Sequence, residues 1–174
     1  MEKHQWVSYL TRLSRQHGGM SALIHHDFES RSGDVVEACE HVPRRYLRRY
    51  AVVSKIHPWA QYLWRDPAGT PIFPDERRVY DRVSQDRNTD LFVNTLIRLG
   101  IPIGMGAILW KDRHPNPRHV FAIAILRPGD PKKGDAFTRE EKDLFARQIP
   151  ALVKDIQTHD RVRSLRGDMT DFKR

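Results

Sequence analysis

The stretch that decides the fold class runs from residue 104 to residue 127, GMGAILWKDRHPNPRHVFAIAILR. Gly104–Lys111 and Val120–Arg127 are two apolar runs of strand length. The polar, proline-rich segment Asp112–His119 between them is typical of the tip of a long hairpin. These residues therefore predict two neighbouring antiparallel strands.

A second hairpin is predicted nearer the N-terminus. Met20–His26 and Val35–His41 have the composition of strands, and Glu29–Asp34 supplies the turn between them. Thr70–Phe73 predicts a further short strand. Helices are predicted up to Gly18, from Pro43 to His57, over Asp90–Leu99 and from Thr138 onward. Because helices lie between strand pairs and no regular β-α-β order is present, we expect an α+β domain, an antiparallel sheet flanked by helices.

The last predicted helix has a clear N-terminal signal. Thr138 and Glu141 form a T-x-x-E capping box. We expect one long helix from here, bent at Pro150, and a charged tail that frays over Arg161–Arg174. One apolar stripe runs along the helix, formed by Phe145, Ile149, Leu152 and Ile156. This stripe can dock on the protein's own sheet or form a dimer with a second protomer. The domain is placed at residues 1–160 and the tail at 161–174.

Composition limits the function classes. The chain has 174 residues, a net charge of +8 and 30% charged residues, which suits one domain with a basic surface and an acidic partner. Cys39 is the single cysteine, which excludes an internal disulfide framework. No nucleophile elbow, P-loop or zinc-protease motif is present, so we do not expect an enzyme. The charged N-terminus is unlike a signal peptide and no apolar run has the length of a membrane span, so a cytoplasmic protein without membrane contact is expected.

The segment Pro43–Arg65 combines aromatic rings with basic residues and contains no acidic residue. Aromatic walls with a few polar tips are what a small-molecule pocket needs. The candidate ligand-binding residues are Tyr46, Tyr50, His57, Trp59 and Phe73. The alternative is that these rings are ordinary core and the arginines a solvated helix face. Direct binding of single-stranded nucleic acid is disfavoured, because the helical wheel separates the arginines from Tyr46 and Tyr50.

A metal site on the first hairpin is a weaker alternative. His25 and His26 are neighbours on one strand, so they point to opposite faces of the sheet and cannot both face one ion. Cys39 and His41 share a face, and with one of those histidines they would make three ligands. Core or surface histidines are the favoured interpretation, so neither a metal nor any other cofactor is predicted. Haem ligation through His57 is disfavoured further.

Three segments resemble the N-terminal, GAF/PAS-like sensor domain of LuxR-type transcriptional regulators. The first is YAVVSKIHPW at Tyr50–Trp59, which is similar to the family's Y…(N/D/H)-P-W stretch. The second is Asn88–Trp110, where a helix leads through Leu99-Gly100-Ile101 into a G-x-G-A-(I/L)-L strand. The third is FTREEKDLFARQIPALV at Phe137–Val153. Together they span most of residues 6–160, and their order and spacing carry the resemblance.

The resemblance implies a central antiparallel sheet with helices on both sides, a small-molecule pocket between them and a homodimer. The acyl-homoserine-lactone subgroup has an Asp-Pro pair where this sequence has His57-Pro58. The helix-turn-helix domain that follows such sensors is not part of this sequence, so DNA contact is expected only through such a domain. The expected function is ligand sensing for a transcriptional regulator, through a change in packing or dimerisation. The alternative is a stand-alone protein-interaction module that uses its basic face without a ligand.

Overall fold

The computed structural model describes residues 2–28, 35–47, 66–73, 94, 97–98, 100, 103–115, 117–129 and 136–171. The described elements are three helices and five strands, in the order α1 (Glu2–His17), β1 (Met20–Asp27), β2 (Val35–Glu40), β3 (Pro71–Ile72), β4 (Ile103–Lys111), β5 (His119–Arg127), α6 (Arg139–Ile156) and α7 (Asp160–Asp171). The α+β class that the sequence predicted is confirmed. No helix in the described ranges is long and apolar enough to cross a membrane.

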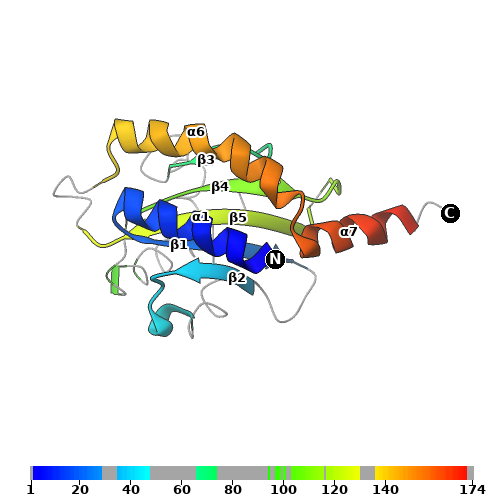
Figure 1. The fold of residues 1–174 in the computed structure, drawn as a ribbon, viewed down its shortest axis with the longest axis horizontal. Coiled ribbons are helices and arrows are strands. Elements are labelled where there is room, and N and C mark those ends of the chain that lie inside the picture. Colours follow the sequence, from blue (N-terminus) through cyan, green and yellow to red (C-terminus); the bar gives the residue numbers. More distant parts are fainter. Residues whose placement is uncertain are drawn as a thin grey trace.

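The five strands form one antiparallel sheet in the order β2-β1-β5-β4-β3. The predicted hairpin β4–β5 lies at its centre (Figure 1). Buried Asp112 organises the tip of this hairpin, because its carboxylate accepts hydrogen bonds from the backbone N–H groups of His114, Arg118 and His119 at 2.9 to 3.0 Å. The Asp112 carboxylate thus satisfies backbone N–H donors of the loop that the strand pairing leaves unbonded.

Helices α1 and α6 pack on one face of the sheet, which we call the helix-covered face (Figure 1). In α1 the buried side chains recur every three to four residues, which directs one side of the helix onto the sheet. Its contributions to the core are Trp6, Leu10 and Leu13. The strands contribute alternate residues to the same core, among them Leu23, Met105, Ala107, Phe121, Ile123 and Ile125.

The chain after the capping box differs from the single long helix that the sequence predicted. Helix α6 passes through Pro150 and ends at Ile156, and α7 begins at Asp160 (Figure 1). In an unbroken helix the stripe that ends at Ile156 would continue at positions three and four residues further along. The next core residue is instead Val162, which is 0% exposed, so the break brings this valine into the core. The stretch that we expected to fray is helical as far as Asp171 in the structure.

Candidate functional site

The face of the sheet opposite α1 and α6 carries the candidate site, and we call it the distal face. Its centre is made of small residues. Ala22 of β1 lies beside Ala124 of β5, and Ala124 lies beside Gly106 of β4, so the three form one row across the sheet. A β-carbon added to Gly106 would come within 2.6 Å of the carbonyl oxygen of Ile123, so this position requires glycine. Small side chains leave room above the strands for a group that packs on them.

Tyr46 occupies that room. It follows Pro43 on a helical turn in which the backbone N–H groups of Tyr46 and Leu47 donate to the Pro43 carbonyl oxygen at 2.9 and 3.2 Å. The Tyr46 side chain is only 3% exposed and belongs to a cluster of buried residues with Met20, Ala22, Ile24 and Leu126. Tyr46, which we predicted to line a pocket, therefore packs directly on β1 and β5.

A small cavity remains beside Tyr46. Its lining consists of Tyr46 and residues of β1 and β5, namely Met20, Ser21, Ala22, Ile24, Ala124 and Leu126. Its free volume of about 10 Å³ is room for roughly one water molecule, whereas ligand pockets are commonly about 300 Å³ or larger. The Ser21 hydroxyl donates to the Leu10 carbonyl oxygen at 2.8 Å, so it is engaged with α1. A ligand at this position would have to take the space that the Tyr46 ring fills.

Phe73 lies elsewhere. It is 6% exposed and belongs to the core of the helix-covered face, with the Lys142 ammonium of α6 5.4 Å from the centre of its ring. Tyr46 belongs to the cluster on the distal face. The structure therefore does not bring Phe73 and Tyr46 into one pocket. The other candidate ligand-binding residues, Tyr50, His57 and Trp59, lie outside the described residues.

The four residues proposed for dimerisation pack within the single chain. Phe145, Ile149, Leu152 and Ile156 are 0 to 2% exposed and all belong to the core of the helix-covered face. Of the two alternatives for this stripe, docking on the protein's own sheet is the one that the structure contains. Their side chains present almost no area to a second protomer in this conformation, so any dimer contact has to use other residues.

The alternative metal ligands are separated. His25 lies on the helix-covered face beside Phe121, whereas Cys39 packs against the cluster on the distal face. Strand β2 ends at Glu40, and His41 has a φ of 57°, so His41 does not continue the alternation that placed it beside Cys39. Among the residues that the structure describes, no group of three or more His, Cys, Asp or Glu side chains could hold a metal ion.

His25 instead belongs to a polar group in the core that the sequence analysis missed. Its side chain is 0% exposed, and its Nε2 atom lies 3.3 Å from Nδ1 of His119. The Nδ1 atom of His25 lies 3.7 Å from a carboxylate oxygen of Glu37, too far for a hydrogen bond. Glu37 is left out of the β1–β2 pairing at a β-bulge, which directs its side chain toward His25. Neither of these two facing atoms has a hydrogen-bond partner among the residues that the structure describes.

Burial sets the protonation state of His25. Removal of the ring from water, the positive charge of Arg161 and the neighbouring His119 lower the pKa of His25 to about 4, although Asp27 opposes them. The ring is therefore neutral at pH 7 and acts as an aromatic core residue. Sequence alone does not indicate this cluster, because its members come from β1, β2 and β5 and meet only through strand register.

A second interaction that sequence analysis missed joins β5 to the start of α6. The Arg127 guanidinium donates to the Glu141 carboxylate at 2.6 Å and to the Ala136 carbonyl oxygen at 3.0 Å, and it lies 4.1 Å from the ring centre of Phe137. Burial acts to raise the pKa of Glu141, but the Thr138 backbone N–H and the Arg127 guanidinium outweigh it and hold this pKa below its ordinary value. The predicted capping box between Thr138 and Glu141 is confirmed.

Within the described part of the chain, the geometry thus favours the distal face under Tyr46 as a small-molecule position, whereas the buried cluster of His25, Glu37 and His119 serves packing. Comparison with models of known protein families and with curated proteins gave no match to this chain.

Proposed function

We propose that the chain is a small-molecule-sensing input domain of a LuxR-type transcriptional regulator, with a GAF/PAS-like fold. The resemblance of Tyr50–Trp59, Asn88–Trp110 and Phe137–Val153 to that family supports the proposal, and the antiparallel sheet with packed helices is compatible with it. The observation that carries most weight is the row of small residues on the distal face, on which the Tyr46 ring packs. Such a surface accepts a flat or flexible ligand once the ring moves.

In the proposed mechanism a ligand competes with the Tyr46 ring for the distal face. A ligand can shift a conformational equilibrium only by its differential affinity for the two states, so it has to bind better when Tyr46 is displaced. The central strands carry the effect across the sheet. Ala124 faces the ligand, while Ile123 and Ile125 on either side of it belong to the core that holds α6. A change in strand position thus alters the packing of α6, which leads directly into α7.

The proposed mechanism acts on transcription through a dimer and a DNA-binding domain. We propose a homodimer in the cytoplasm, without membrane contact, and DNA recognition through a helix-turn-helix domain in the same or a partner chain. Neither catalysis nor a cofactor is part of the proposal. Because Phe145, Ile149, Leu152 and Ile156 are buried in one chain, the proposed dimer forms through other surfaces or after α6 has shifted.

Mass spectrometry of the purified full chain tests the proposal. We expect a native spectrum with an added small mass that disappears under denaturing conditions, which also gives the mass of the ligand. A thermal-shift screen with acyl-homoserine lactones and common metabolites follows. An unloaded protein whose melting temperature no compound raises contradicts ligand sensing and favours the interaction-module alternative.

A pair of variants locates the binding position. Tyr46→Ala enlarges the space on the distal face, so it is expected to change the ligand-induced shift in melting temperature severalfold. Leu47→Ala is the matched control, because Leu47 follows on the same turn and is 36% exposed. Equal ligand-induced shifts in both variants would place the ligand away from the distal face.

A further inference from the structure

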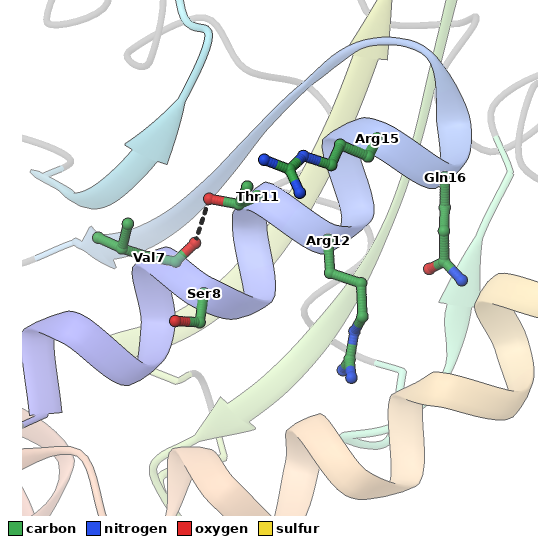
Figure 2. A pocket seen from close by; sticks show the side chains of 6 residues that line it. All are labelled: Val7, Ser8, Thr11, Arg12, Arg15 and Gln16. Carbon is green, nitrogen blue, oxygen red and sulfur yellow. Dashed lines mark hydrogen bonds between the residues drawn. The ribbon is translucent and has the colours of Figure 1, made fainter.

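The outer side of α1 forms a shallow surface groove of about 400 Å³ (Figure 2). Its described lining consists of Val7, Ser8, Thr11, Arg12, Arg15 and Gln16. These positions alternate with the buried side of the helix, so the groove faces away from the sheet. It is thus separate from the distal face on which the proposed ligand binds.

The groove has two cationic sides. In Figure 2 the Arg12 side chain extends toward α6, whereas Arg15 extends to the opposite side of α1. The Arg12 guanidinium lies 5.0 Å from the ring centre of Tyr9, which restricts its motion, and the Tyr9 hydroxyl donates to the Asp155 carboxylate of α6. Within the described part of the chain, no carboxylate pairs with either arginine. The groove therefore offers guanidinium donors on both sides of α1, and the contact with Tyr9 restrains that of Arg12.

The rest of the lining favours a peptide. Val7 is 39% exposed at the start of the groove, so an apolar side chain of a partner can cover it. Val7 and Arg15 are two helical turns apart, roughly 12 Å along the axis. The Thr11 hydroxyl donates to the Val7 carbonyl oxygen at 2.8 Å, which leaves the arginines as the main donors to a partner. The matching segment carries two acidic residues, one to meet each arginine, and an apolar residue to cover Val7.

We infer that this groove is a docking surface for an acidic helical segment of a partner protein, and this inference is independent of the proposed ligand sensing. A symmetric contact between the grooves of two copies is disfavoured, because it would place Arg12 and Arg15 of one copy against the same arginines of the other. Nucleic acid is also disfavoured, because affinity for a phosphate backbone grows with the number of cations and two arginines provide few contacts. The described lining also contains no aromatic ring on which a base could stack.

The test uses the full chain and fluorescein-labelled helical peptides of about 18 residues, a length at which an isolated helix can form. Three peptides each carry one leucine and two glutamates, and the spacing between the two glutamates is three, four or seven residues. In three matched peptides, both glutamates are replaced by glutamine. Fluorescence anisotropy at physiological salt is expected to show that at least one glutamate peptide binds tenfold or more tightly than its glutamine counterpart. Raising the salt concentration should weaken this binding.

Two double variants with the same change in charge locate the contact. Arg12→Gln with Arg15→Gln is expected to weaken peptide binding tenfold or more. Arg139→Gln with Arg147→Gln, at exposed positions on α6, is the control and should change it less than twofold. Circular dichroism checks that both variants fold.

Three outcomes would overturn the inference. The first is a lack of preference for glutamate over glutamine peptides, and the second is an equal loss of binding in both double variants. The third is a single-stranded oligonucleotide that binds as tightly as the best peptide and depends equally on Arg12 and Arg15, which would assign the groove to nucleic acid.

Discussion

The ring of His25 stacks on the ring of Phe121, with centroids 4.5 Å apart and planes inclined by 11°. Both side chains are 0% exposed, so an ionisable residue fills an aromatic position in the core. On its other sides the imidazole meets His119 and, across an unbridged gap, Glu37. Stacking is compatible with a neutral ring, and a charge here lacks the water that would stabilise it.

Stability is therefore expected to fall as the pH is lowered below 6.5. The pKa of His25 is about 4 in the folded chain and 6.5 for a free histidine, so the unfolded state binds more protons between these values. Complete protonation of His25 would lower the free energy of unfolding by roughly 3 kcal/mol. His25→Gln should make the free energy of unfolding less dependent on pH between 6.5 and 4, although it lowers stability at pH 7 through lost stacking.

Urea denaturation at several pH values across this range measures the effect. His41→Asn is the control, because His41 is exposed and asparagine tolerates its positive φ. A pH dependence that is the same in wild type and His25→Gln would show that His25 does not cause it.

The capping box at the start of α6 gives a second prediction. The Thr138 hydroxyl accepts from the Glu141 backbone N–H at 3.2 Å, and the Glu141 carboxylate accepts from the Thr138 backbone N–H at 2.7 Å. Thr138→Ala removes the first contact and is expected to lower the free energy of unfolding by about 1 kcal/mol. Thr138→Ser keeps the hydroxyl and should have little effect. Urea denaturation compares the two, and an equal loss in both would show that the methyl group of Thr138, not its hydroxyl, stabilises this helix.

Gly106 gives a third prediction, about the distal face. Gly106→Ala places a β-carbon against the Ile123 carbonyl oxygen, which is backbone and cannot rotate away, so we expect a loss of roughly 1–3 kcal/mol. Gly18→Asn is the control. Gly18 has a φ of 65°, which asparagine tolerates, and no atom lies within 4 Å of a β-carbon added there. Thermal unfolding should rank the alanine variant well below the asparagine variant, and the reverse order would mean that β4 and β5 can separate slightly at little cost.

A fourth prediction separates the two aromatic candidates for the pocket. Tyr46→Leu and Phe73→Leu each remove a ring from a buried position, so both are expected to lower the melting temperature. Only the Tyr46 variant should also change the shift that a bound small molecule causes, because Phe73 lies on the other face of the sheet. The measurement is a thermal-shift titration with the compound found by mass spectrometry. A changed ligand response in the Phe73 variant alone would place the ligand on the helix-covered face.

Local patterns in the sequence were enough to predict the central hairpin and the start of α6. The apolar runs around Asp112–His119 predicted the central hairpin, and β4 and β5 agree with it to within one residue at each end. The capping box was equally clear, because its two residues are three positions apart and interact within one helical turn. These features depend on neighbours in the chain, which a single sequence displays.

The sequence by itself thus determined the α+β class, both hairpins and the start of α6. Only the tertiary structure decided which side chains meet across elements. Phe73 contacts Lys142 and not Tyr46, and a β-bulge directs Glu37 toward His25. Val162 lies in the core because the helix is broken between α6 and α7. The reason is that strand register and helix packing assign each residue to a face, and a shift of one residue reverses that assignment along a whole strand. Such contacts join positions far apart in the chain, and no local pattern encodes them.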